Sequence, residues 1–316
     1  MLIIGSIFMK KFSVMVFSII GLMLSGGGEL KSNSYVFHEK VTILPTGTDG
    51  TAGTNAVYAY FGDWPQTVKS LDVTVDETKT ITIGFNTYYL GSDNCYYAKL
   101  EEHGYSPEYK YSDGTPVLRS WPYDEKIKYF KVEPIKWRIL TDNYNGVGRA
   151  LLLAEDILDS RLVFYDGGGR KFCEYKSSSI RAYLNTKSYS DGCFLKSAFT
   201  ENAQQKISFT NVENEDGTIL TDKIFLLSLN DIKNNRYVFE QSNINSLIKY
   251  PTDYSLAKGI IKLFETEGSP WWLSTTECKA GKAWCILWNG KEGCNDSTIR
   301  EYGIVPAITI NLNGLK

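Results

Sequence analysis

Histidine is almost absent from this chain of 316 residues: only His38 and His103 occur, and none follows position 103. Histidine is the usual general base near neutral pH and the commonest metal ligand, so most of the chain lacks the material for such a centre. Runs of basic residues are also absent, and 34 lysines and arginines against 36 aspartates and glutamates give a net charge of −2. No overall field therefore favours nucleic acid or an anionic membrane surface as a partner.

Sequence motifs of common catalytic and cofactor sites are missing as well. The chain contains no nucleophile elbow, phosphate loop or dinucleotide fingerprint. None of its six cysteines has the two-residue spacing of a zinc or redox motif. Trp288-Asn289-Gly290 and Asn295-Asp296 have only a faint likeness to the calcium ligands of lectins, which must supply several oxygens. We therefore expect no catalytic residues, no metal and no cofactor.

Apolar and aromatic residues are abundant. The chain is 43% hydrophobic and 14% aromatic, with 21 tyrosines and 15 phenylalanines, which is ample for a large core rich in β-structure. The stretch 268–312 is the most informative, because four of the seven tryptophans lie within 18 residues of it. Apolar runs of strand length alternate there with turns such as Asn289-Gly290. The chain is therefore expected to finish in buried strands.

Residues 1–28 have the pattern of a secretory signal peptide. Lys10-Lys11 precede the uncharged run Phe12–Leu24, which is short for a membrane span, and small residues follow. Met9-Lys10-Lys11 begins this pattern more naturally than Met1, so either methionine can be the start. A lipid anchor is not expected, because Gly27 stands where a lipoprotein signal has cysteine. The pattern predicts export to the cell envelope, periplasm or surface, with cleavage near residues 25–30 and no membrane span in the mature chain.

The rest of the chain divides into a spacer and one globular domain. Residues 29–55 are polar and of low complexity, which is typical of a flexible spacer. Globular sequence begins at Ala56 and extends to 316. Alternation after Ala56 stops at Pro65, which predicts an edge strand or a strand end.

Hydrophobic periodicity places strands before and after a group of helices. The expected strands cover 56–64, 73–76, 80–83, 129–141, 150–154 and 221–228, and the expected helices cover 177–185 and begin near Thr200 and Ser228. The strands at 129–141 and 150–154 are expected to form a hairpin. This order defines an α+β fold.

Several motifs resemble an uncharacterised bacterial cell-envelope family, a domain of unknown function found in exported proteins. The motifs lie between 56 and 312: Phe61-Gly62-Asp63-Trp64-Pro65-Gln66, Glu133-Pro134-Ile135-Lys136-Trp137-Arg138-Ile139-Leu140, Ala150-Leu151-Leu152-Leu153-Ala154, Ser179-Ile180-Arg181-Ala182-Tyr183-Leu184-Asn185, Thr221-Asp222-Lys223-Ile224-Phe225-Leu226-Leu227-Ser228, Trp271-Trp272-Leu273 and Gly303-Ile304-Val305-Pro306-Ala307. The family resembles the C-type-lectin-like fold in the version shared with formylglycine-generating enzymes. The resemblance implies that the last strands return beside the segment 56–67, and that loops of the C-terminal region bind ligands. Family members often continue the tryptophan pair with Leu-Arg-Ser-Pro, whereas Ser274 follows Leu273 here.

The even number of cysteines in an exported chain permits complete disulfide pairing. Short sequence separations favour pairs among Cys278, Cys285 and Cys294, or Cys173 with Cys193. Buried free thiols are the alternative. A formylglycine-generating oxidase would need two cooperating cysteines within its own motif, and that motif is not found.

The expected ligand surface consists of aromatic and polar residues of the C-terminal region: Trp271, Trp272, Trp284, Trp288, Asn289, Lys291 and Asn295. Exposed indoles stack on glycans or anchor protein partners. Core packing is the competing interpretation for most of these tryptophans, and Trp288, beside the Asn-Gly turn, is the one expected to be exposed. The sequence thus predicts a non-catalytic surface protein that binds a protein or glycan. A degenerate oxidase of the formylglycine-generating type and a purely structural envelope component are the alternatives.

Overall fold

The computed structural model describes residues 36–44, 56–103, 106–117, 127–165, 174–186, 192–214, 216–234, 237, 244–262, 267–276 and 279–311. The chain divides into a unit of residues 1–33 and a unit of residues 34–316. The predicted signal peptide, 1–28, lies outside the described residues. No helix among the described residues is long and apolar enough to cross a membrane.

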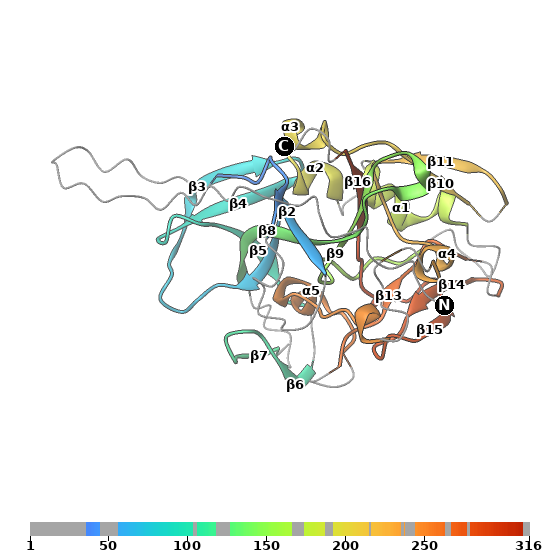
Figure 1. The fold of residues 1–316 in the computed structure, drawn as a ribbon. Coiled ribbons are helices and arrows are strands. Elements are labelled where there is room, and N and C mark those ends of the chain that lie inside the picture. The colour runs from blue at the N-terminus through green and yellow to red at the C-terminus, as the bar shows by residue number, and fades with distance from the viewer. Residues whose placement is uncertain are drawn as a thin grey trace, which may run out of the picture. The chain divides into compact units, whose positions relative to one another are not determined.

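A large antiparallel sheet organises the second unit (Figure 1). Its hydrogen-bonded order is β12-β16-β9-β8-β5-β4-β3, with β2 paired to β8 and β1 paired to β2. Its strands are β1 (Thr42–Ile43), β2 (Val57–Val68), β3 (Val75–Ile83), β4 (Asn86–Gly91), β5 (Tyr96–Glu101), β8 (Ile127–Thr141), β9 (Ala150–Ala154), β12 (Ile224–Phe225) and β16 (Ala307–Ile310). The runs predicted at 73–76 and 80–83 belong to the single strand β3, which carries a bulge between Asp76 and Thr80.

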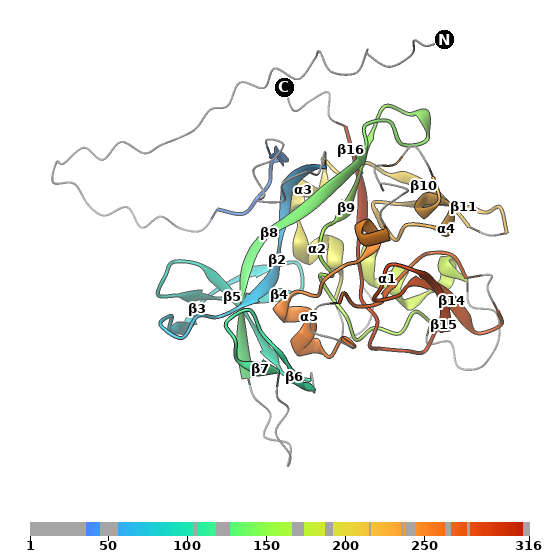
Figure 2. The same cartoon turned by 60° about the horizontal axis from the view of Figure 1, so that its bottom comes forward.

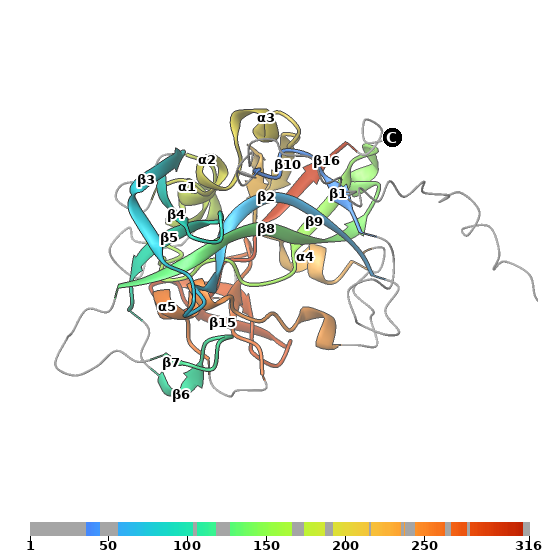
Figure 3. The same cartoon turned by 90° about the vertical axis from the view of Figure 1, so that its left-hand side faces the viewer.

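Strand β8 is the centre of this sheet, and Figures 2 and 3 show it running beside β2. It pairs with β2, β5 and β9 along different parts of its length. Its predicted hairpin with β9 is confirmed. Trp137 is fully buried and its indole donates to the carbonyl oxygen of Phe61 at 2.7 Å, which fastens β8 to β2.

The N-terminal part of the folded unit reaches further upstream than the sequence indicated. Residues 36–44 lie within the predicted spacer 29–55, yet β1 pairs with β2 and Val41 packs against the core. His38 binds Asp63 through its backbone nitrogen and through Nδ1, each at 2.7 Å. The boundary at residue 56 is therefore wrong for 36–44, because a polar strap can be held by hydrogen bonds that composition does not reveal.

Pro65 lies inside β2 rather than at its end, since the strand continues to Val68. Pro65 stands opposite Val132 of β8, and β8 is the only strand paired to β2 at that point among the described residues. The edge-strand alternative was therefore correct. An edge strand tolerates proline because its outer side has no ladder donor to lose.

The helices are few and short. They are α1 (Ser179–Asn185), α2 (Phe194–Ala198), α3 (Glu201–Gln204), α4 (Leu229–Ile232) and α5 (Asp253–Lys258), with 3-10 turns at Tyr144–Gly146, Tyr175–Ser177 and Ile244–Leu247. The three predicted helix starts are confirmed by their caps, because the side chains of Ser178, Thr200 and Ser228 each accept from a backbone nitrogen three residues on. Helices α2 and α5 were not predicted; α2 has no side-chain cap, whereas Thr252 caps α5 in the same way.

Three small antiparallel sheets complete the fold: β6–β7 (Ser106–Lys110, Pro116–Val117), β10–β11 (Thr210–Glu213, Ile219–Asp222) and β13–β14–β15 (Trp271–Trp272, Lys282–Ile286, Glu292–Asp296). The run predicted as one strand at 221–228 is divided between β11, β12 and the cap of α4. The described fold is therefore α+β, with mostly antiparallel sheets and short helices.

The last strand does not return beside the first long one. Strand β16 pairs with β9 and β12, so β8 and β9 separate it from β2. The expectation that the last strands return beside the segment 56–67 is therefore wrong. The reason is that β9 forms a hairpin with β8, and β16 then pairs with the free edge of β9.

Candidate functional site

The turn between β14 and β15 presents Trp288 and Asn289. Leu287 accepts a hydrogen bond from the nitrogen of Gly290 at 2.9 Å and donates its own nitrogen to the oxygen of Lys291 at 2.7 Å. Gly290 has φ +78°, a conformation that glycine adopts without strain. Asn289 Oδ1 accepts from the nitrogen of Lys291 at 3.1 Å. The Asn-Gly pair is thus explained by the turn, and the Asn289 oxygen is used within it.

Strand register assigns the predicted ligand residues to two faces of the β13–β15 sheet. Paired residues of antiparallel strands point to the same face. Trp272 stands opposite Cys285, which stands opposite Gly293, so these three share one face, the Cys285 face. Trp284 belongs to the other face, where it stands opposite Cys294. Asn295 lies on the Cys285 face, because its Nδ2 is 3.5 Å from Cys285 Sγ.

The tryptophan pair is part of the core. Trp271 and Trp272 are both 0% exposed, and Trp271 donates its indole hydrogen to the oxygen of Leu247 at 3.1 Å. Trp272 packs against Phe164 and Tyr302, with ring centroids 5.5 and 4.7 Å apart. The expectation that these two rings are surface platforms is therefore wrong. They are buried because β13 is paired with β14, forms a bridge to Gly303 and is covered by aromatic rings.

A smaller set of predicted residues remains accessible. Trp284 and Trp288 are partly buried, Asn289 and Asn295 are partly buried, and Lys291 is exposed. Next to Lys291, Glu292 is exposed and forms an ion pair with Lys233 at 3.2 Å. The candidate ligand surface therefore contracts to the indoles of Trp284 and Trp288 and the charged residues after the turn, and we call this set the hairpin surface.

The cysteines follow the same division into faces. Cys285 is a buried free thiol, and burial raises its pKa to about 11, although the hydrogen bond from Asn295 acts to lower it. Cys294 is disulfide-bonded. Cys193 is free, so the pairing of Cys173 with Cys193 is wrong, and Cys285 takes no part in a disulfide. Cys285 and Cys294 cannot meet, because Cys294 stands opposite Trp284, and Trp284 and Cys285 face opposite sides of the sheet. Cys173 and Cys278 lie outside the described residues, so the predicted pairing of Cys278 with Cys294 remains a prediction.

A half-buried group of charges lies where β8 meets the end of β9. Arg138 binds Glu155 through Nε at 2.9 Å and Nη2 at 2.5 Å, and Lys249, whose side chain is 2% exposed, reaches Glu155 Oε2 at 3.1 Å. Burial acts to raise the pKa of Glu155, but the charges of Lys249 and Arg138 outweigh it and lower the pKa to about 2. This carboxylate is therefore ionised and fully engaged, which suits a structural role better than proton transfer.

A fully buried carboxylate, Asp159, is paired with α5. Asp159 is 1% exposed, accepts a hydrogen bond from the hydroxyl of Tyr183, and binds Lys258 Nζ at 2.5 Å. Sequence reasoning missed both Glu155 and Asp159. The chain offered no signal for them, because their partners come from segments about 17 to 100 residues away.

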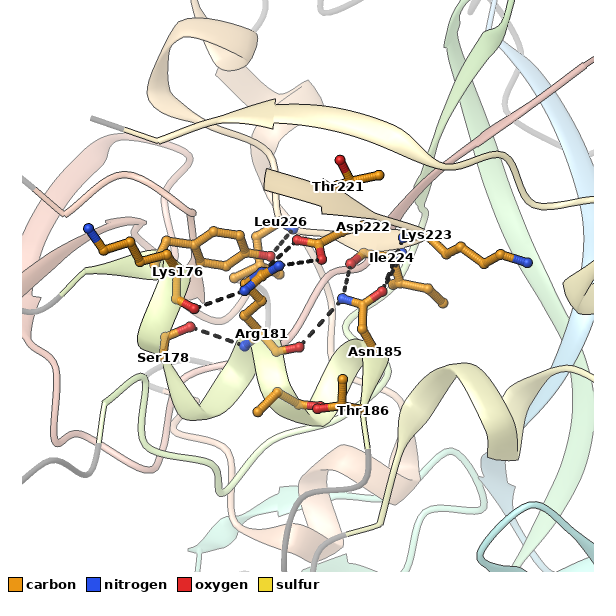
Figure 4. Close-up of polar contacts among 12 residues, drawn as sticks. Lys176, Ser178, Arg181, Asn185, Thr186, Thr221, Asp222, Lys223, Ile224 and Leu226 are labelled. Carbon is orange, nitrogen blue, oxygen red and sulfur yellow. Dashed lines mark hydrogen bonds and ion pairs between the residues drawn. The ribbon is translucent and has the colours of Figure 1, made fainter. Parts of the chain in front are cut away.

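Two motifs of the family resemblance meet in an ion pair (Figure 4). Arg181 of α1 donates through Nε and Nη2 to the two carboxylate oxygens of Asp222, at 2.8 and 2.9 Å. Its Nη1 donates to the backbone oxygen of Lys176 at 2.9 Å. The Asp222 side chain is 3% exposed and that of Arg181 is 27% exposed. The guanidinium therefore fastens α1 to the end of β11 in a bidentate geometry.

Asn185 makes the second contact between the same motifs. Its Oδ1 accepts from the nitrogens of Lys223 and Ile224 at 3.1 and 3.0 Å, and its Nδ2 donates to the oxygen of Ile224 at 2.6 Å (Figure 4). The amide thus replaces a strand partner for the backbone between β11 and β12. These donors and acceptors are satisfied within the chain, so we assign Arg181, Asp222 and Asn185 to the architecture rather than to a ligand site.

Among the described residues, no group of three or more histidine, cysteine, aspartate or glutamate side chains is arranged to hold a metal ion. The fold and the two motifs of Figure 4 define an α+β protein built around a central antiparallel sheet and a tryptophan-rich C-terminal sheet. The chain belongs to the family described as Domain of unknown function (DUF6273), whose model matches residues 147–312. That match begins after β8, so strands β1 to β8 precede it. No curated protein and no solved structure matches the chain.

Proposed function

We propose that this protein is an exported, non-catalytic protein of the cell envelope or surface that binds a glycan or a protein partner through the hairpin surface. The observation that carries the proposal is the position of Trp288, a partly exposed indole held at a tight turn and followed by exposed charges. A rigid aromatic ring with a polar rim is the usual anchor of glycan stacking and of protein interfaces.

The chemistry of Cys285 weighs against the alternative of a formylglycine-generating oxidase. A reactive cysteine needs a thiolate in a partly exposed, electropositive position. Cys285 is 0% exposed with a pKa near 11, and Cys294 on the opposite face of the sheet is already oxidised. The described cysteines therefore offer no cooperating thiol pair to such a mechanism.

The C-type-lectin-like arrangement and the export of the chain are further parts of this proposal. An antiparallel sheet with short helices and a C-terminal hairpin supports the resemblance, whereas the position of β16 beside β9 departs from it. The charged and apolar pattern of residues 1–28 supports export. Amino-terminal sequencing of the native protein tests it, and an intact Met1 or Met9 would contradict it.

Substitution of Trp288 tests the binding surface. Screening the folded chain on glycan and surface-protein arrays should yield a ligand, and Trp288→Ala should weaken that binding by about 1 to 3 kcal/mol, the scale of stacking aromatics. The free energy of unfolding should change much less, because the ring is partly exposed before substitution.

Trp271→Ala is the matched control, because its ring belongs to the same sheet but is fully buried. It should cost about 3 to 5 kcal/mol of folding stability through lost transfer energy and a cavity. If Trp288→Ala destabilised the protein as much as Trp271→Ala, Trp288 would be a core residue. The purely structural interpretation would then replace ligand binding.

A further inference from the structure

The hairpin of β10 and β11 has one buried and one exposed face. Buried and exposed residues alternate along both strands, so one set of side chains points to the interior and the other to solvent. Phe209 and Lys223 continue the outward set, because the Lys223 ammonium lies 5.0 Å from the centroid of the Phe209 ring. Figure 2 shows the hairpin at the margin of the fold. The ribbon face, as we call it, consists of three cross-strand pairs: Phe209–Lys223, Asn211–Thr221 and Glu213–Ile219.

Two large apolar side chains lie at diagonally opposite corners of the ribbon face. Phe209, at one end of β10, is 62% exposed, and Ile219, on β11 at the other end, is 54% exposed. Single exposed apolar residues are common on soluble proteins and need no explanation. Two of them on a face of only six residues are different, because a partner that covered this face would remove both from water at once.

The other two corners carry opposite charges. Lys223 extends away from the Arg181–Asp222 pair (Figure 4), and its ammonium donates to the backbone oxygen of Gln204 at 2.6 Å. In the part of the chain that the structure describes, Lys223 has no carboxylate partner and Glu213 has no cationic one. A lysine and a glutamate at diagonal corners are therefore available to groups outside the described fold.

This arrangement makes the ribbon face complementary to itself. A two-fold axis that lies in the interface along the Phe209–Ile219 diagonal places each apolar side chain against its own copy. The same axis places Lys223 of each copy against Glu213 of the other. An axis along the second diagonal would instead oppose lysine to lysine and glutamate to glutamate, which repel. An anionic polymer or membrane fits this face less well, because Glu213 would lie against it.

We propose that the ribbon face is a self-association surface whose partner is a second copy of this chain, joined about the Phe209–Ile219 diagonal. The two apolar side chains supply the contact that removes area from water, and two Lys223–Glu213 pairs set the register. Six residues per copy are few beside the about 20 to 30 of a standard interface, so the dimer is weak and reversible. None of these residues belongs to the hairpin surface, so the proposal does not depend on a ligand there.

Sedimentation of the folded chain between about 10 μM and 1 mM tests this proposal, since a small interface associates in that range. The wild type should convert from monomer to dimer as its concentration rises. Ile219→Thr should move the midpoint of association about tenfold higher, because each dimer loses apolar burial twice. Leu71→Ser is the matched control: Leu71 is 86% exposed but lies outside the ribbon face, so its midpoint should not move.

Exchange of the two charges tests the register. Lys223→Glu and Glu213→Lys should each abolish dimer formation when present alone, because like charges then meet. An equal mixture of the two variants should form dimers again, because every corner then meets its opposite. Thermal unfolding shows whether each variant is folded, and Ile219→Thr decides the question if a charge variant is not.

Three results would overturn the proposal. The first is a wild-type chain that stays monomeric up to 1 mM, the upper limit of about 10 μM to 1 mM for such an interface. The second is association that Ile219→Thr and the charge variants leave unchanged, which would place the contact elsewhere on the chain. The third is a mixture of the two folded charge variants that stays monomeric, because Lys223 and Glu213 would then not face each other across the dimer.

Discussion

Removing the Arg181 side chain tests whether the contact between the two family motifs holds the fold together. Arg181→Ala would leave Asp222, whose side chain is 3% exposed, as an uncompensated charge. Breaking a buried pair in this way costs about 3 to 5 kcal/mol. Because the Arg181 side chain is 27% exposed and partly screened by water, we expect the lower end, about 3 kcal/mol.

Urea unfolding followed by tryptophan fluorescence measures this loss. With a slope of about 2 to 3 kcal/mol per molar urea, the midpoint should fall by about 1 M. Lys176→Ala is the control, because its exposed ammonium pairs with Glu174 and Asp216 at 3.1 and 2.9 Å while its backbone oxygen still accepts from Arg181. Its midpoint should move far less.

The double variant Arg181→Met, Asp222→Leu separates charge from packing. Replacing both members of a buried ion pair by apolar groups is often neutral. The double variant should therefore recover most of the stability that Arg181→Ala loses. A midpoint for Arg181→Ala equal to that of Lys176→Ala would refute the reasoning, since Asp222 would then have found solvent or another cation.

Three further predictions concern titratable groups. The hydrogen bond to Asp63 raises the pKa of His38 above 6.5 despite burial. The stabilisation from protonated His38 is therefore present below pH 6.5 and lost as pH rises. The difference in stability between wild type and His38→Phe should shrink toward alkaline pH in a stability–pH series. The pKa of Glu155 is about 2, against 4.5 unperturbed. The stability that ionised Glu155 contributes is therefore present above pH 4.5 and lost as pH falls toward 2. Glu155→Gln should flatten the acid limb of a stability–pH series, and an unchanged limb would mean that Lys249 does not hold this carboxylate. Native alkylation followed by peptide mass spectrometry should spare Cys285 until the protein unfolds, and rapid labelling would contradict its burial.

Local signals predicted much of the architecture. The serine and threonine caps located the starts of three helices, because a capping hydroxyl needs only residues three positions away. The hairpin of β8 and β9 followed from alternation on each side of a turn. The predicted position of β16 was wrong, because strand order depends on which edge of the sheet each strand leaves open. Alternation within a strand carries no information about its neighbours.

The ligand surface was predicted less well because a tryptophan has the same sequence signal in a core as on a surface. Trp271 and Trp272 adjoin Pro270 and Leu273 in an apolar run, and the structure buries both. Trp288 could be distinguished because it precedes Asn289-Gly290, a turn signal that places its neighbours at the surface. The charged group around Glu155 had no such signal, since an ion pair between distant segments follows from the fold and not from spacing.

The composition of the hairpin surface determines how its binding should respond to salt. Trp284 and Trp288 supply partly exposed indoles, and Lys291 and Glu292 supply exposed charges after the turn. Trp271 and Ile286 share the face of Trp284 but are fully buried, so they add no area for a ligand. A ligand of the hairpin surface should be held mainly by stacking and be sensitive to salt, because charges surround it. Measuring binding to the folded chain over a salt series checks this expectation, and an affinity that does not change with salt would contradict it.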